Sequence, residues 1–322
     1  MTPQRLLTVT SAACLLIYSA GVCRAQGETD SAKAVRHSKE ASDLAKAAQN
    51  PVANMVSLPL QYNYYTGGGL GSTSEMILNL QPVLPLEINK EWLLISRTIV
   101  PFTSVPLPLS VPASVSLPPA LSDTARSTGI ADIQEQTYFT AAKPGKITWG
   151  IGPIFSFPTA TNNVVRTGQW GLGPTAVALV MPGPWVIGTL VNNIWRVGGD
   201  DHGATLNAFT LQPFINLNLP HAWAISTAPL MTSNWSAPRG QRWTVPLGGG
   251  VSKIAHIGDQ PMNFLLQYYH NVNHPRIAGR NSVRLEAAAL WPTAEAKAAK
   301  EKEAKEVAAK EKAAKESGRK DP

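Results

Sequence analysis

The chain has 322 residues, with 28 Lys/Arg against 21 Asp/Glu and a formal charge of +7. Its two cysteines, Cys14 and Cys23, both lie in the first 25 residues, so the rest of the chain can hold neither a disulfide nor a zinc–thiolate site. The basic residues are spread along the chain rather than clustered, which argues against a surface for nucleic acid.

Residues 1–25 have the features of a secretory signal peptide. Arg5 precedes an apolar run that ends at Tyr18, and small residues lead to an expected cleavage after Ala25. The run is too short to span a bilayer as a helix. Bulky Val22 argues against the alternative, a lipidated Cys23. We expect an exported protein whose residues 26–50 form a periplasmic N-terminal segment.

Residues 51–292 are poor in charge and rich in proline, glycine and tryptophan, yet no stretch of eighteen apolar residues occurs there. Spanning helices are therefore excluded, and a closed barrel is the remaining way to cross a membrane. Apolar and polar residues alternate in several segments: Val56, Leu58 and Leu60 alternate with Ser57 and Gln61. Near the end, Val283, Leu285 and Ala287 alternate with Ser282, Arg284 and Glu286. This period of two predicts strands with one lipid face and one lumen face.

We expect an all-β, antiparallel, up-and-down transmembrane barrel of about twelve strands. The strands are predicted at 53–64, 74–87, 92–102, 129–141, 146–158, 169–181, 185–196, 206–218, 222–233, 242–255, 261–271 and 281–291. The connections between them alternate between short turns and longer loops, as in barrels with periplasmic turns and outer loops. An even strand number places both chain ends in the periplasm. Glu135 is an anomaly, because alternation puts it on the lipid face with Ile133, Thr137 and Phe139. A soluble β-sandwich is the alternative, but it does not explain the alternating loops.

Residues 293–322 differ in composition, with repeated alanine, lysine and glutamate. Glu301 and Lys305, like Glu306 and Lys310, stand at the helix-stabilising i, i+4 spacing. No apolar stripe accompanies them, which predicts a solvated helical tail. The tail is a candidate contact for periplasmic envelope components.

Several segments, in order, resemble a family of bacterial outer-membrane proteins known by the labels transporter, neuromedin U (a misnomer) and phenol meta-pathway-associated. The resemblance rests on residues 45–54, 79–85, 96–101, 149–153, 170–174, 190–195 and 211–214. It implies an outer-membrane barrel and little specific chemistry. The proline-rich stretch 106–121 and the charged tail are departures from that family.

Charged residues that alternation directs inward are the candidate lumen-lining residues. They are Glu75, Asp132, Arg196, Arg284 and Glu286. Such side chains either line an aqueous path or pair with one another and block it. No cofactor or metal is expected, because no histidine pair has metal-ligand spacing.

These features predict a porin-like channel or transporter of a Gram-negative outer membrane, with lipid and a small-molecule permeant as its partners. One alternative is a non-conducting envelope barrel that serves as an interaction scaffold. Another is a lipid hydrolase with a Ser–His pair on the lipid face, for which His270 is the candidate histidine, although no serine can be tied to it. We therefore expect a protein that is not an enzyme.

Overall fold

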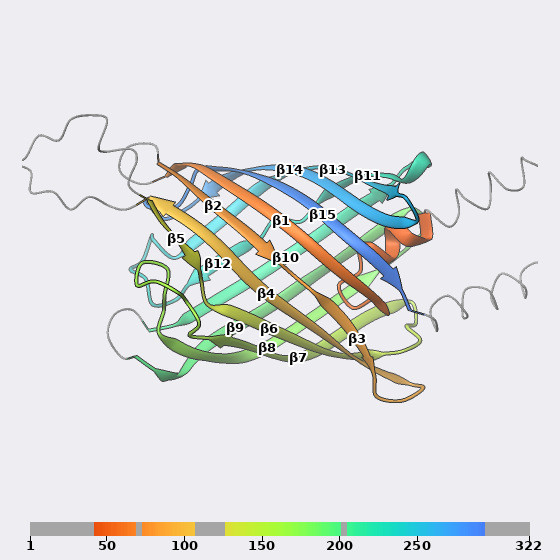
Figure 1. The fold of residues 1–322 in the computed structure, drawn as a ribbon, viewed down its shortest axis with the longest axis horizontal. Coiled ribbons are helices and arrows are strands. Elements are labelled where there is room, and N and C mark those ends of the chain that lie inside the picture. Colours follow the sequence, from red (N-terminus) through yellow and green to blue (C-terminus); the bar gives the residue numbers. More distant parts are fainter. Residues whose placement is uncertain (1–41, 69–72, 107–125, 201–204, 294–322) are drawn as a thin grey trace, which may run out of the picture. The chain divides into compact units, whose positions relative to one another are not determined.

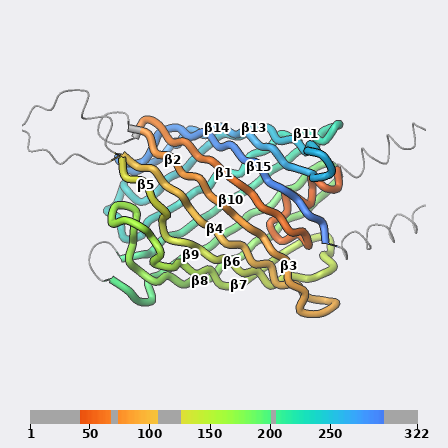
Figure 2. Tube along the Cα trace, viewed as in Figure 1, coloured from red at the N-terminus to blue at the C-terminus, as the bar shows by residue number. Residues whose placement is uncertain are grey.

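The computed structural model describes residues 42–68, 73–106, 126–200 and 205–293. Their strands form one antiparallel sheet that closes on itself, because β1 (Met55–Gly68) pairs with β15 (Asn281–Pro292) and β9 (Trp185–Gly199) pairs with β10 (Asn207–Asn218). Figure 1 shows the resulting barrel, and Figure 2 traces its inclined strands around the wall. The expected signal peptide, the first part of the N-terminal segment and the charged tail lie outside the described residues.

Twelve barrel strands make up the wall, and three of them are interrupted once. The interrupted strands are β2 (Thr73–Leu80) with β3 (Val83–Glu87), β5 (Arg126–Ile130) with β6 (Ile133–Ala141), and β11 (Trp223–Thr227) with β12 (Met231–Asn234). The others are β4 (Trp92–Pro106), β7 (Ile147–Phe157), β8 (Gln169–Val180), β13 (Trp243–Ile257) and β14 (Gln260–Asn273), in addition to β1, β9, β10 and β15. The predicted twelve-stranded barrel is confirmed, and the ends of the predicted strands lie within four residues of the observed ends.

The two ends of the barrel differ in their connections. At the end where β1 begins and β15 finishes, here called the turn end, short links such as residues 142–146 and 258–259 join the strands. A 3-10 helix, η1 (Pro220–Ala222), forms one of them. At the opposite end, the loop end, residues 158–168 and 274–280 form longer links. The predicted alternation of turns and loops is therefore present.

Burial follows the predicted alternation along each strand. In β14, Phe264, Leu266 and Tyr268 are exposed on the outside, whereas Gln267 and Tyr269 are buried inside. Successive side chains point to opposite faces of a strand. The register therefore directs every second side chain to the outside and the side chains between them to the lumen. The outer surface is consequently apolar and the lumen mixed.

Two Trp-Gly-x-Gly-Pro segments, 149–153 and 170–174, lie side by side in β7 and β8, with Pro153 directly opposite Pro174. Neither proline has an N–H for the neighbouring strand. A Cβ on Gly152 would lie 1.9 Å from the Thr137 carbonyl oxygen of β6, and one on Gly173 would lie 1.6 Å from that of Asn193 in β9. Only glycine permits these approaches, and Cα–H···O contacts can partly replace the missing hydrogen bonds.

The N-terminal segment lies inside the turn end. Residues 42–48 are helical, and Ala45 is buried against Met55, Ile254 and Leu290. The side chains of Gln49 and Asn218 exchange two hydrogen bonds of 2.9 and 3.1 Å. Among the described residues, no helix has the length and apolar character needed to cross a membrane.

Candidate functional site: the barrel lumen

The inward side chains form two different arcs of the barrel wall. One arc carries hydrogen-bonded polar residues, which we call the polar belt. The belt comprises Gln61, Asn63, Gln81, Arg97, Ser226, Gln267, Arg284 and Glu286. The other arc carries buried apolar residues, which we call the apolar patch. The patch comprises Leu93, Ile95, Tyr138, Val177, Leu179, Val186, Leu190 and Phe214.

The belt is continuous from β4 to β1. Arg97 donates to the Gln81 amide oxygen, and the Gln81 amide nitrogen lies 3.4 Å from Oε1 of Gln61. Gln61 Nε2 donates to Glu286 at 3.0 Å, and Asn63 donates to Gln61 at 3.2 Å. Gln61 and Gln81 are thus partnered across strands and Asn63 along β1, which offsets the cost of removing these amides from water.

Arg284 connects the belt to the interrupted strand β11–β12. Its Nε donates to Asn63 at 3.2 Å, and its Nη1 lies 3.1 Å from the Ala228 carbonyl and 3.3 Å from the Gln267 amide oxygen. Ala228 lies in the interruption between the two strand segments, and its N–H donates to the Tyr269 hydroxyl at 2.9 Å. The Arg284 guanidinium also stacks over the Tyr269 ring. Its contacts are therefore with neutral oxygens and a ring, and no ion pair involves it within the described residues.

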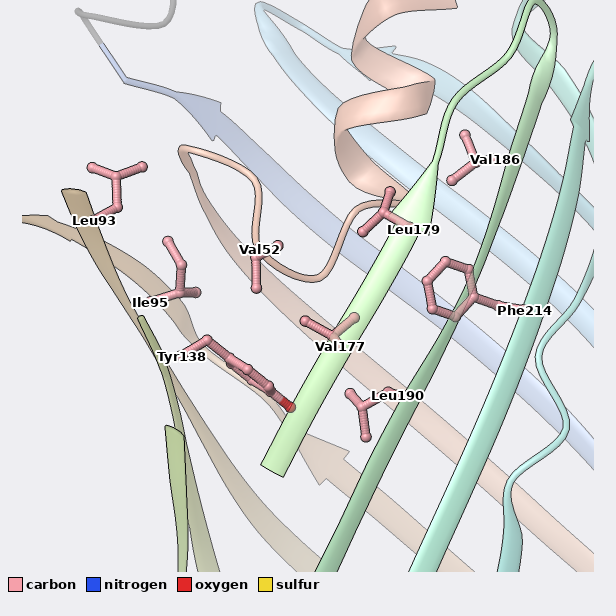
Figure 3. Close-up of a cluster of buried hydrophobic side chains, with 9 residues drawn as sticks. All are labelled: Val52, Leu93, Ile95, Tyr138, Val177, Leu179, Val186, Leu190 and Phe214. Atoms are coloured by element: carbon pink, nitrogen blue, oxygen red, sulfur yellow. The ribbon is translucent and has the colours of Figure 1, made fainter. Parts of the chain in front are cut away.

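The apolar patch holds the N-terminal segment. Figure 3 shows Val52 between Leu93, Ile95 and Tyr138 on one side and Val177, Leu179 and Phe214 on the other. Val52 is only 4% exposed. Gly150 makes room for it, because a Cβ there would lie 3.0 Å from Val52 Cγ1. The patch therefore binds an apolar side chain that is not part of the wall.

Tyr138 is fully buried and carries the polar group of this patch. Its hydroxyl donates to Gln136 Oε1 at 2.8 Å and accepts from the Thr175 hydroxyl at 3.1 Å. The ring thus presents an apolar face to Val52 while its hydroxyl is satisfied by the wall.

A cavity of about 220 Å³ lies on the lumen side, closer to the loop end. Tyr65, Ile77, Leu230 and Tyr269 supply apolar and aromatic surface, and Glu75 and Arg284 supply charge. The cavity thus combines apolar surface with a few polar groups, as in small-molecule sites.

The five candidate lumen residues are in three kinds of place. Glu75 and Arg284 line the cavity, and Glu286 accepts from Gln61 in the belt. Asp132 lies at the loop end, where its carboxylate accepts from the backbone N–H groups of Ala160 and Thr167 and therefore orders that loop. Arg196 donates to the Gly199 carbonyl at 3.0 Å, and its buried Nε has no hydrogen-bond partner within the described part of the chain.

The anomaly at Glu135 has a local explanation. The register pairs Glu135 with Thr98, on the outer face of the barrel. Ser96 and Thr98 donate their hydroxyl protons to the two carboxylate oxygens, each at 2.6 Å. An outward carboxylate is thus tolerated because the next strand satisfies both of its oxygens.

The hydrolase alternative depends on the surroundings of His270. His270 is exposed on the outer face, and its Nδ1 lies 2.9 Å from the Asn281 amide oxygen; among the described residues it forms no hydrogen bond with a serine. Within the same ranges, no group of three His, Cys, Asp or Glu residues is arranged to hold a metal ion. Of the loop residues Asp200, Asp201 and His202, the structure describes Asp200, which forms an ion pair with Arg166; the other two lie outside the described residues.

Comparison with known proteins supports the fold. The chain is similar to the COG4313 outer membrane channel from Pseudomonas putida F1, with 13% identity and a TM-score of 0.54 over 74% of this chain and 95% of that chain. Lower TM-scores, 0.42 and 0.37, relate it to the CymD monoaromatic hydrocarbon channel and to a FadL homologue of Pseudomonas aeruginosa, at 13% and 10% identity. These cover 78% and 76% of this chain and 92% and 93% of the other chains. No family model and no curated protein matches the sequence.

Proposed function

We propose that this protein is an outer-membrane channel that passes a small, largely apolar molecule through its lumen. The apolar patch is the observation that carries the proposal. An interior lined only by polar side chains favours water and ions, whereas one of the two arcs of this lumen, from Leu93 to Phe214, is apolar. An arc that binds Val52 can bind an apolar permeant by the same burial of surface.

The outer surface supports a place in the outer membrane. Its exposed aliphatic side chains include Leu58, Ile151 and Leu266. Aromatic clusters lie at both ends: Trp92 stacks on Phe139 at the turn end, and Phe157 packs edge-on against Trp170 at the loop end. Two such girdles around an apolar band are the pattern of membrane barrels. With the turn end facing the periplasm, the start of β1 and the end of β15 both lie on the periplasmic side, as expected for an exported barrel.

The family resemblance supports the same proposal. The two Trp-Gly-x-Gly-Pro segments contribute to it, and both have a defined role in the wall at Pro153 and Pro174. The barrel shared with the channel from Pseudomonas putida F1 is compatible with that family.

Residues 42–54 lie in the path of a permeant at the turn end. Passage into the periplasm therefore requires Val52 to leave the apolar patch or the segment to move as a unit. The same observation favours one second candidate, a non-conducting envelope barrel that acts as a scaffold, since a lumen held closed would carry no permeant.

Single-channel recording of the refolded protein in planar bilayers tests the proposal. We expect brief openings whose current is reduced by indole, a small neutral aromatic probe, but not by glycerol at the same concentration. Val177→Thr, in the patch, should weaken the block by indole, whereas Val180→Thr, on the outer face of the same strand, should not. A correctly folded barrel that never conducts would instead support the scaffold.

A further inference from the structure

A groove of about 600 Å³ crosses the outer face of β13, β14, β15 and β1, which lie next to one another in Figure 1. Its walls include the exposed side chains of Leu60, Phe264 and Leu266. Ala287 provides a low point between them, because its methyl group is directly flanked by Phe264 on β14 and Leu60 on β1. The groove is therefore an apolar depression on the outer surface, separate from the lumen.

One end of this groove carries a cation. Lys253 and Trp223 both line it, and the Lys253 ammonium lies 4.6 Å from the centroid of the Trp223 ring. Lys253 forms no ion pair within the described residues. Trp223 follows η1 directly, so this end is at the rim of the barrel. A lysine that lies along apolar surface and directs its ammonium to an interfacial tryptophan is placed at the height of lipid headgroups.

The groove runs from its Lys253 end across the neighbouring strands. The register connects Lys253 to Phe264, Phe264 to Ala287 and Ala287 to Leu60, which is three strand spacings. At about 4.8 Å per spacing this is about 14 Å across the strands, around the barrel wall. An acyl chain that begins at Lys253 and crosses Ala287 can therefore contact Phe264 and Leu60 along its length.

We propose that this groove is a binding site for a single phospholipid of the periplasmic leaflet, with the lipid phosphate paired to Lys253 and one acyl chain over Ala287. The site rests on the proposed outer-membrane location but not on conduction. The charge on Lys253 selects the occupant: a phosphate satisfies the ammonium, whereas a second apolar barrel face would leave it unpaired. The Trp223 indole N–H, at the same rim, is a donor for a lipid ester carbonyl.

Native mass spectrometry of the intact, refolded barrel tests this site. Delipidated protein in mild detergent is mixed with phosphatidylglycerol, and the fraction carrying one lipid is measured. We expect one tightly retained lipid. Lys253→Ala should reduce its affinity about tenfold, the change that 1.4 kcal/mol produces. Lys146→Ala is the matched control, because Lys146 is an exposed cation at the same end of the barrel, outside the groove.

A second variant separates the acyl chain from the headgroup. Ala287→Phe fills the groove while leaving Lys253 in place, and it should also displace the lipid without altering heat-modifiability on gels. The inference is overturned by any of three results: no retained lipid in the wild-type protein, equal loss in the Lys146 and Lys253 variants, or a dimer that occupies this face. Conductance recorded from the same preparations shows whether such a failure concerns only the groove or also the channel.

Discussion

The two arcs of the lumen wall are both formed by antiparallel strands, but one carries hydrogen-bonded polar side chains and the other carries buried apolar side chains. In the polar belt, Gln61, Gln81 and Arg284 are each hydrogen-bonded to a neighbouring strand. In the apolar patch, Ile95 and Tyr138 are fully buried against side chains of other strands and against Val52. The belt therefore uses its polar groups to join strands, while the patch keeps a surface that a foreign apolar group can occupy.

This difference suggests where a permeant binds. A polar permeant would have to compete with hydrogen bonds that the belt already makes, and buried hydrogen bonds are costly to leave unmade. An apolar permeant needs only to replace Val52 on the patch. We therefore propose that the polar arc is mainly structural and that a permeant would bind on the apolar arc.

The largest effect is expected for Arg284→Glu in the belt. The new carboxylate would face the oxygens of Asn63, Ala228 and Gln267, which accept from the arginine in the native protein. Leaving an unpaired charge there should lower the free energy of unfolding by about 3–5 kcal/mol. Urea unfolding in detergent micelles measures the loss. Arg239→Glu, at an exposed loop position, is the control and should leave stability unchanged. Equal stability of the two variants would show that Arg284 does not hold the belt together.

Val52→Asp should act on the apolar arc without unfolding the barrel. A carboxylate cannot be buried against Ile95, Tyr138 and Val177 without a partner, so the N-terminal segment should leave the lumen. Trypsin cleavage after Lys46 measures this release. Val52→Ala removes two methyl-sized groups, worth about 1.6 kcal/mol at about 0.8 each, and should give a smaller increase in cleavage. Full protection of Lys46 in the aspartate variant would mean that the patch does not hold the segment.

Gln49→Ala should have the smallest effect. It removes the reciprocal amide pair with Asn218, but Asn218 still donates to the Pro184 carbonyl at 3.0 Å. The loss of about 1 kcal/mol should raise the open probability of the channel about fivefold. Lys46→Ala on the same helical stretch tests whether any shortening of a side chain has this effect. If both variants behave alike, the amide pair has no specific role.

Several strands could be predicted because their own residues alternate between an apolar face and a polar face. In β14 and β15, every second residue is apolar, so Leu266 and Leu285 could be assigned to the outside without knowing their neighbours. The inward direction of Gln267 follows from the same pattern. Its partners do not, because the bonds to Ser226 and Arg284 depend on the three registers that connect β11, β13, β14 and β15.

Features that depend on distant parts of the chain could not be predicted. Glu135 contradicted the pattern of its own strand, and only the pairing with β4 reveals Ser96 and Thr98 as its donors. Alternation directs the charged side chain of Asp132 into the lumen. In the structure its carboxylate instead accepts from the N–H of Ala160, 28 residues further along the chain, and orders that loop. Val52 belongs to a segment with no regular period, and its binding site is assembled from five strands. The one feature of the sequence that singled out Val52 was its position in residues 45–54, one of the segments that resemble the outer-membrane family.

A reversible disulfide between residue 52 and the barrel wall would test directly whether the passage runs through the apolar patch. A Cβ at Gly150 would lie 3.0 Å from Val52 Cγ1, close to the separation of about 3 Å between a Cβ and the far sulfur of a disulfide. With Cys14 and Cys23 removed with the expected signal peptide, Val52→Cys with Gly150→Cys would supply the two cysteines of the mature chain. Single-channel conductance is recorded before and after reduction, with each single-cysteine variant as a control. If the passage runs through this site, we expect no openings while the disulfide is intact and openings like those of the single variants after reduction. Undiminished conductance with the disulfide intact would show that the passage does not run through the site occupied by Val52.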